Sequence, residues 1–257
     1  MPNESNMKEC AFCTYSGKLT REHIFAKWVR DLFPGHQDAF YIGGQSNRNE
    51  RFTTDAIDWK AKVVCKECNE TWMSGIEANL AKPALTPFVT GNIDIPITKE
   101  IARSIAIYAF KTAVVQNHAD HKNNPFFSAR LRHAFKKNRS IPKDVSIWVC
   151  GIKHNLPKIQ VMTAYYKGRL SPTYSLNMYV FTCGIGNLVI QAVSVKQIGK
   201  TALRPLAGYE NIGIPVWPSI FSGQTWPGRY VLDGDGGQFE GFAKRWARIK
   251  PTTDVYL

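Results

Sequence analysis

Two periods of hydrophobic residues divide the chain. Up to about residue 135, apolar side chains recur every three or four positions, which is the spacing of amphipathic helices. We therefore expect a short helix after residue 23, a helix of about three turns from residue 69, a helix over 98–117 and another around residue 131. The residues that define these helices are Ile24, Trp28, Val29, Leu32, Trp72, Ile76, Leu80, Ile101, Ile105, Tyr108, Ala109, Thr112, Phe127, Leu131, Ala134 and Phe135.

Beyond Pro142 the period changes to that of β-strands. Four runs of strand length are rich in β-branched and aromatic residues, and turn residues separate them. A helical spacing returns near the C-terminus, where Phe239, Phe242 and Trp246 oppose basic side chains. These elements predict an α+β fold in which helices cover an antiparallel sheet. The four runs are 145–152, 158–166, 176–183 and 187–193, and the opposing basic residues are Lys244, Arg245 and Arg248.

A proline-containing segment separates two expected domains. Pro83, Pro87 and Pro96 fall within residues 82–98, and proline interrupts helices because it lacks an N–H group. We therefore predict a small domain over 1–81, a linker over 82–98 and a basic α+β domain over 99–257. Residues 34–55 are rich in glycine, asparagine and charge, which predicts a long loop or an irregular hairpin.

The charge of the chain indicates a polyanionic partner. The 33 Lys and Arg and 20 Asp and Glu give a net charge of +13. Residues 1–90 hold 11 basic and 11 acidic side chains, so residues 91–257, with 22 and 9, carry the whole excess. DNA or RNA fits such a surface, although a basic solvated surface without a partner is the alternative. The candidate phosphate-binding residues, which could equally form a solvated helix face, are Arg130, Arg132, Lys136, Lys137 and Arg139.

The chain shows no sign of membrane insertion. Its first residues lack the basic start and apolar run of a signal peptide, and its most apolar stretch, residues 179–193, is too short and too polar to span a bilayer. We therefore expect a cytoplasmic protein. The sequence does not indicate an oligomeric state.

Four of the six cysteines form two pairs, Cys10-x2-Cys13 and Cys65-x2-Cys68. Thiolates two residues apart on a tight turn occupy two corners of a tetrahedron, so two such turns predict a four-coordinate structural zinc site. In a reducing compartment metal binding is favoured over disulfides, and the alternatives are buried thiols or a redox couple. We expect the remaining cysteines, Cys150 and Cys183, to be small buried hydrophobes, and His118 and His121 to face solvent.

Between and after these pairs lie residues suited to phosphodiester chemistry. His23 can accept a proton near pH 7, and its neighbour Glu22 can bind a divalent cation such as Mg or Mn. Asn69 directly follows Cys68 and can offer a neutral oxygen to the same cation. Taken singly, Glu22 and His23 could be ordinary surface or core side chains, and Asn69 could be the N-cap of the helix that begins there.

The order CxxC, Glu22-His23, CxxC-Asn69 resembles the HNH (ββα-metal) endonuclease superfamily, especially the branch that contains phage Holliday-junction-resolving endonucleases. The resemblance covers roughly residues 8–81. It implies a ββα-metal domain in which the four cysteines hold zinc, His23 is the general base, and Glu22 and Asn69 bind one catalytic Mg or Mn ion. The implied reaction is hydrolysis of DNA to 5′-phosphate and 3′-hydroxyl ends.

The chain departs from the family's usual pattern in three places. Glu22 replaces the usual Asp, the stretch 60–64 lacks the middle Asn, for which Asp58 is the nearest polar candidate, and a helical pattern follows His23 directly. The sequence also fits two alternative functions. They are a zinc-stabilised nucleic-acid-binding protein without catalysis and an HNH-type ribonuclease.

Overall fold

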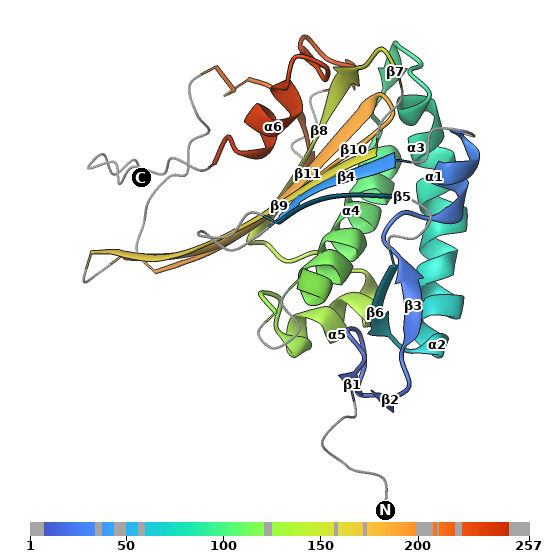
Figure 1. Ribbon diagram of the computed structural model, residues 1–257, viewed down its shortest axis with the longest axis vertical. Helices are drawn as coiled ribbons and strands as arrows, with labels where there is room; N and C mark the ends of the chain where they lie inside the picture. The colour runs from blue at the N-terminus through green and yellow to red at the C-terminus, as the bar shows by residue number, and fades with distance from the viewer. Residues whose placement is uncertain are drawn as a thin grey trace, which may run out of the picture.

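A computed structural model describes residues 8–33, 38–43, 50–55, 60–120, 125–156, 159–171, 174–198, 208–209, 211–218 and 223–246. Figure 1 shows how its elements are arranged. In chain order they are β1 (Lys8–Glu9), β2 (Ser16–Gly17), β3 (Thr20–His23), α1 (Lys27–Asp31), β4 (Asp38–Gly43), β5 (Glu50–Asp55), β6 (Lys60–Val64), α2 (Lys66–Cys68), the π-helical turns η2 (Asn69–Met73) and η3 (Ile76–Ala81), α3 (Lys82–Val89), β7 (Ile95–Pro96), α4 (Lys99–Asp120), α5 (Ala129–Asn138), β8 (Val145–Lys153), β9 (Ile159–Ser171), β10 (Tyr174–Ile185), β11 (Leu188–Ile198), β12 (Ile214–Trp217), β13 (Thr225–Trp226), β14 (Val231–Asp233) and α6 (Gln238–Ala243).

The mixed α+β architecture expected from the sequence is confirmed. An eight-stranded sheet has the order β12-β8-β11-β10-β9-β4-β5, with β14 paired beside β8. Neighbouring strands are antiparallel, except that β4 runs parallel to β9 and β14 parallel to β8. The four predicted runs became β8 to β11. The turn between β10 and β11 needs Gly186, because its φ is +55° and a Cβ there would lie 2.6 Å from the Val89 oxygen.

Strands β8 to β11 are buried on both faces of the sheet. On β8, Ile147 and Val149 belong to the large core that includes α4, whereas Cys150 and Ile152 pack with Phe242 of α6. Successive side chains of a strand point to opposite faces, so burial of both faces explains why the strand runs are almost continuously apolar. Figure 1 accordingly shows α4 and α6 on different sides of the sheet.

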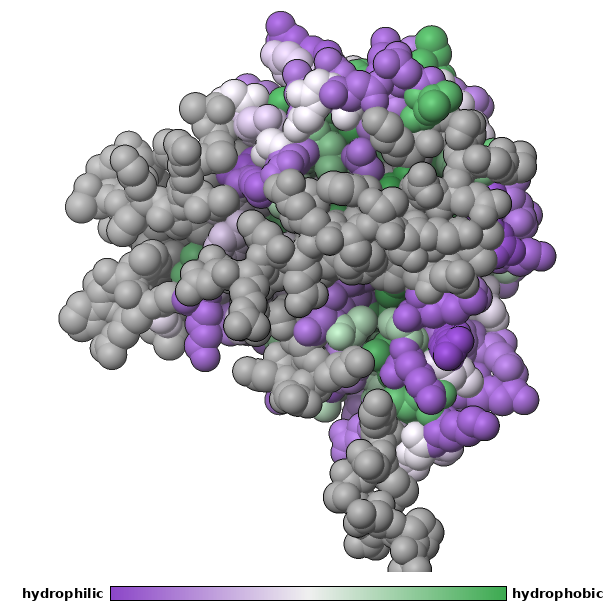
Figure 2. All heavy atoms as spheres, viewed as in Figure 1, coloured by the Kyte–Doolittle hydropathy of each residue, from purple (hydrophilic) through white to green (hydrophobic). Residues whose placement is uncertain are grey.

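A second, small unit lies on the far side of α4 from the sheet (Figure 1). In it, β3 pairs with β6 in an antiparallel ribbon, and the helix formed by α2, η2, η3 and α3 follows β6 directly. The hairpin of β1 and β2 precedes β3. Figure 2 shows mainly hydrophilic residues on the described surface over this unit. The helix predicted after residue 23 is α1, and the helix predicted from residue 69 is part of the longer helix that begins at α2.

The predicted linker is wrong in its first half. Residues 82–89 form α3, which continues the preceding helix, instead of a non-helical segment. Pro83 lies at the junction of η3 and α3, where the helix changes from π-type to α-type pairing. Pro87 lies inside α3 and costs a backbone hydrogen bond, but its neighbour Phe88 is fully buried against Trp226, with 5.0 Å between the ring centroids. Burial therefore outweighs the local preference of proline.

The predicted arrangement of two domains is not confirmed. Strand β4, from the expected first domain, pairs with β9 of the expected second domain, and a single hydrophobic core extends from Phe12 to Trp226. Residues 38–43 and 50–55, expected in a loop or irregular hairpin, form the regular hairpin of β4 and β5. In the part of the chain that the structure describes, none of the helices is both long and apolar enough to cross a membrane.

Next to the C-terminal helix α6, the position predicted for Arg245 is wrong. Arg245 is buried instead of exposed, and its Nε donates to Oε1 of Gln191 at 2.8 Å. Its guanidinium also lies over the rings of Phe242 and Trp246. The aromatic residues therefore enclose Arg245 instead of opposing it. Arg248 lies outside the described residues.

Candidate metal centre and catalytic residues

The four predicted zinc ligands converge. The Sγ atoms of Cys10, Cys13, Cys65 and Cys68 all lie within 4.8 Å of one another, and Cys13 and Cys65 are separated by 3.7 Å. Zinc–sulfur bonds of about 2.3 Å in a tetrahedron place sulfurs about 3.8 Å apart. This all-thiol donor set therefore suits a structural zinc ion. Cys150 and Cys183 lie elsewhere and are buried, as expected.

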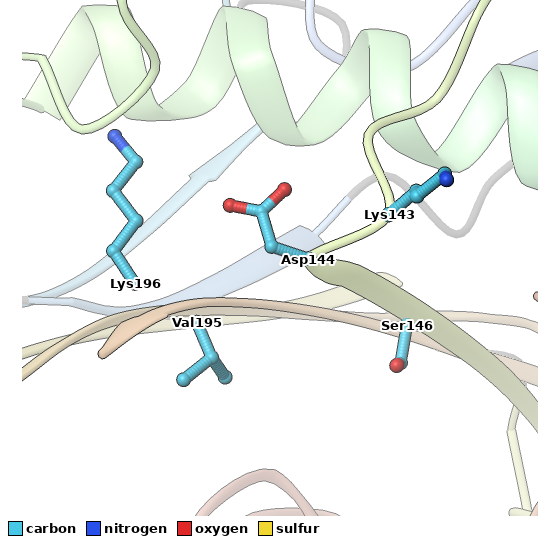
Figure 3. Close-up of a pocket in the computed structure, with 5 residues that line it drawn as sticks. All are labelled: Lys143, Asp144, Ser146, Val195 and Lys196. Carbon is cyan, nitrogen blue, oxygen red and sulfur yellow. The ribbon is translucent and has the colours of Figure 1, made fainter. Parts of the chain in front are cut away.

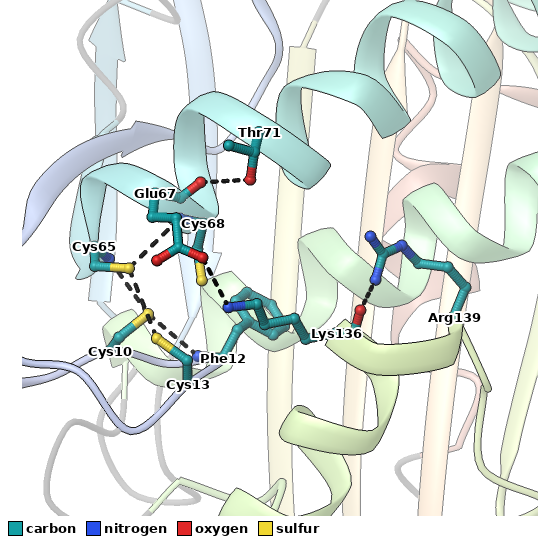
Figure 4. A network of polar contacts seen from close by, with 9 residues as sticks. All are labelled: Cys10, Phe12, Cys13, Cys65, Glu67, Cys68, Thr71, Lys136 and Arg139. Atoms are coloured by element: carbon teal, nitrogen blue, oxygen red, sulfur yellow. Dashed lines mark hydrogen bonds and ion pairs between the residues drawn. The ribbon is translucent and has the colours of Figure 1, made fainter.

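Backbone N–H groups donate hydrogen bonds to two of these sulfurs (Figure 4). The N–H groups of Phe12 and Cys65 point at the Cys10 sulfur, at 3.5 and 3.3 Å, and that of Cys68 points at the Cys65 sulfur at 3.4 Å. A hydrogen bond from the Cys68 thiol and these backbone groups lower the pKa of Cys10, while the same thiol pair raises the pKa of Cys68 and burial raises that of Cys13. Among the four thiols, negative charge is therefore best stabilised on Cys10.

Helix α5 packs over the cysteine cluster. Three of the five predicted phosphate-binding residues, Arg132, Lys136 and Arg139, make contacts there. Arg132 is buried and donates to the backbone oxygens of Phe127 and Ala11. Arg139 stacks over the Trp72 ring at 4.3 Å. Lys136 lies 3.6 Å from a Glu67 oxygen (Figure 4). Arg132 is therefore poorly placed for the predicted phosphate binding, because it is buried and its Nε and Nη1 donate inside the protein. The remaining two, Arg130 and Lys137, are exposed.

Glu22 is buried and paired with a lysine that the sequence analysis missed. Nζ of Lys111 on α4 lies 3.2 Å from Oε1 of Glu22 and 2.6 Å from Oε1 of Glu77 in η3. Burial raises the pKa of Glu22 despite the nearby ammonium. Burial alone would lower the pKa of Lys111, but the carboxylates of Glu77 and Glu22 outweigh it and raise that pKa. The three side chains thus form one buried ionic group.

His23 lies on the opposite face of the ribbon from Glu22. Neighbouring residues of a strand point to opposite sides, and here Glu22 is buried whereas His23 is partly exposed. His23 pairs in register with Lys60, which puts both side chains on the outer face. Exposed Arg21 and Lys62 flank them on the same two strands. The candidate base therefore lies in a basic surface.

Asn69 joins the helix to β3. Its Nδ2 donates to Oγ1 of Thr20 at 3.2 Å, and that hydroxyl donates to the Val64 oxygen at 3.0 Å. The alternative role of Asn69 as helix N-cap is wrong, because the helix begins earlier and Cys65 is its N-cap, accepting from the Cys68 N–H. The side chain of Asn69 therefore remains turned to the ribbon.

The arrangement gives no support to a divalent cation on Glu22 and Asn69. An ammonium already neutralises Glu22, and a second cation beside it would meet like charge. Two signals in the sequence could have indicated this pairing. Lys111 is the only Asp, Glu, Lys or Arg in residues 104–119, and a charge in such an apolar helix requires a buried partner. The second signal is Glu77, an acidic residue in the helix predicted from residue 69, which could supply such a partner.

Two other places carry titratable groups. His118, expected to face solvent, is partly buried, and burial with nearby Arg132 lowers its pKa to about 4, while His121 lies outside the described residues. A hollow of about 540 Å³ is lined by Lys143, Asp144, Ser146, Val195 and Lys196 (Figure 3). The two lysines flank a carboxylate, and Lys196 already donates to the Phe126 oxygen. The hollow therefore favours no particular ligand.

No protein-family model, curated protein or solved structure matches this chain. The resemblance to HNH endonucleases therefore depends on the residues between 8 and 81 themselves.

Proposed function

We propose that the protein is a nuclease of the HNH type that hydrolyses phosphodiester bonds of DNA, with His23 as the general base. The observation that carries the proposal is the convergence of the four cysteine sulfurs. It closes the β1–β2 hairpin onto the start of the helix, so that β3, β6 and the helix form one ββα unit. Such a unit is what the resemblance implies, with His23 at the end of the first strand and Asn69 directly after the last cysteine.

The outer face of the ribbon supplies the surface for the substrate. Arg21, Lys60 and Lys62 surround His23 there, and cationic side chains of this kind neutralise the phosphates of a nucleic acid. Exposed Arg130 and Lys137 on α5 extend the positive charge beyond this unit. The excess charge of the second half of the chain, predicted to hold DNA, would act through such exposed residues.

The proposed reaction follows from the ordinary chemistry of these groups. The neutral imidazole of His23 takes a proton from a water molecule, whose oxygen attacks the phosphorus. The bond between phosphorus and the 3′-oxygen breaks, that oxygen takes a proton from solvent water to become a 3′-hydroxyl, and the phosphate stays on the 5′-end. The basic residues stabilise the negative charge that develops on the phosphate oxygens.

A cleavage assay tests this function. The zinc-loaded full chain is incubated with plasmid DNA, a branched duplex and single-stranded RNA, with and without Mg or Mn. We expect the wild type to cut DNA and the His23→Ala variant to bind but not cut it. His133→Ala, which changes a partly exposed histidine on α5, is the matched control and should cut normally. Equal cutting by His23→Ala and wild type would refute the role of His23, and preferential cutting of RNA would identify a ribonuclease.

The buried pairing of Glu22 with Lys111 favours a second candidate. If the acid next to His23 has only a structural role, the protein is a zinc-stabilised nucleic-acid-binding protein without catalysis. In that case binding would weaken steeply as salt is raised, because displaced counterions set the slope, and no substrate in the assay above would be cut.

A further inference from the structure

Lys111 lies where three elements meet. It projects from α4 to Glu22 on β3 and Glu77 in η3, and only 1% of its side chain is exposed. The carboxylate side chains are 6% and 20% exposed. The Tyr108 ring lies 5.5 Å from the same ammonium. A lysine is rarely buried to this extent unless it is paired, and here both partners come from the proposed catalytic unit.

The ammonium takes the position that a bound metal ion would need. Its distances of 3.2 and 2.6 Å to the Glu22 and Glu77 oxygens place it between the two carboxylates. A magnesium or manganese ion there would require oxygens at about 2.1 Å, and the ammonium would have to leave. Glu22 and Glu77 without Lys111, however, are a pair of oxygen ligands of the kind that divalent cations bind.

We infer that Lys111 is the resident cation of this site, and that the native protein binds no divalent ion at Glu22. Lys111 is thus a positioning residue. Its ion pairs hold β3, and with it His23, against α4 and η3. This inference rests on the proposed function only in treating Glu22 as part of a catalytic site. It also predicts a latent metal site, which removal of the lysine charge would expose.

Manganese binding tests the inference without any substrate. The zinc-loaded full chain and its variants are titrated with Mn²⁺, and free Mn²⁺ is followed by electron paramagnetic resonance. Lys111→Met should gain one site that binds Mn²⁺ about tenfold or more tightly than any site of the wild type. The double variant Glu22→Gln/Lys111→Met should lose this gain. Lys111→Arg, which keeps the charge, should bind like the wild type.

A second comparison remains decisive if Lys111→Met does not fold. The wild type and Glu22→Gln should bind Mn²⁺ alike, since Glu22 holds no divalent ion. Loss of a wild-type Mn²⁺ site in Glu22→Gln would overturn the inference, as would a folded Lys111→Met variant that gains no site. A wild type that cuts no substrate while Lys111→Met gains the manganese site would refute the proposed nuclease and leave the inference on Lys111 intact.

Discussion

Arg132 on α5 donates a hydrogen bond from Nη1 to the backbone oxygen of Ala11, which lies between Cys10 and Cys13 of the candidate metal site. The same guanidinium donates from Nε to the Phe127 oxygen at 3.0 Å. These contacts fix the cysteine turn against a helix that is more than a hundred residues away in sequence. The candidate metal site is therefore part of the main core of the protein and not an appended module.

Replacement of Arg132 by alanine should lower the free energy of unfolding by about 2–4 kcal/mol, because two buried backbone oxygens lose a charged donor. Arg130→Ala, on the exposed side of the same helix, should change it by no more than about 0.5 kcal/mol. Urea unfolding of the zinc-loaded variants measures both. Similar effects of the two substitutions would show that Arg132 does not hold the cysteine turn.

Zinc removal should unfold the cysteine region. The wild type should contain one zinc ion per chain, and Cys65→Ser should lose it and melt at a lower temperature, because metal binding contributes directly to folding. Cys183→Ala provides the control, since Cys183 is buried in β10, far from the cluster in sequence. Metal analysis measures the zinc content, and thermal unfolding measures the melting temperature. Full zinc content in Cys65→Ser would remove Cys65 from the ligand set.

Loss of the Lys111 charge should strongly destabilise the protein. Lys111→Ala leaves Glu22 buried without its cation, which should cost about 3–5 kcal/mol of unfolding free energy. Lys99→Ala, at the exposed start of the same helix, should cost about 0.5 kcal/mol or less. Denaturant unfolding near neutral pH gives both values. A Lys111→Ala variant as stable as Lys99→Ala would show that the ion pairs contribute little.

His118 should make the protein sensitive to mild acid. Its pKa in the folded protein is about 4, below the ordinary 6.5, because burial and Arg132 disfavour the imidazolium. Between these values the unfolded chain binds a proton that the folded protein does not, so the free energy of unfolding falls as pH decreases from 6.5 towards 4.

The His118→Gln variant lacks this group and should lose less stability than wild type when pH is lowered from about 7 to about 5.5. The loss of zinc at acid pH affects both proteins, so the difference between them isolates His118. Urea unfolding at the two pH values measures it. An equal loss in both proteins would mean that His118 titrates normally.

Local patterns predicted the longest helices and strands but neither the short strands nor how the elements assemble. The four strand runs and the helices at residues 99 and 129 could be found because each is long and periodic. The helix at 82–89 could not, because burial of Phe88 against distant Trp226 overrides its prolines. Likewise, the parallel pairing of β4 with β9 joins segments more than a hundred residues apart and leaves no local signal.

The candidate site was predictable to a similar degree. The cysteine spacing alone indicates four converging thiolates, because each pair is a local turn and zinc chemistry supplies the rest. The pairing of Glu22 with Lys111 could not be predicted from local spacing, because only tertiary packing places α4 beside β3. Arg132 and Lys137 lie on the same helix, and only packing decides that one is buried and the other exposed.

The most direct test of the proposed function is the single-turnover cleavage rate of zinc-loaded His23→Ala beside wild type and His133→Ala. Removal of a general base should lower the rate by about a hundredfold or more, with zinc content, stability and DNA binding unchanged. His133→Ala should keep the wild-type rate. A His23→Ala variant that cleaves at the rate of the wild type, or a wild type that cleaves no nucleic acid, would contradict the proposed function.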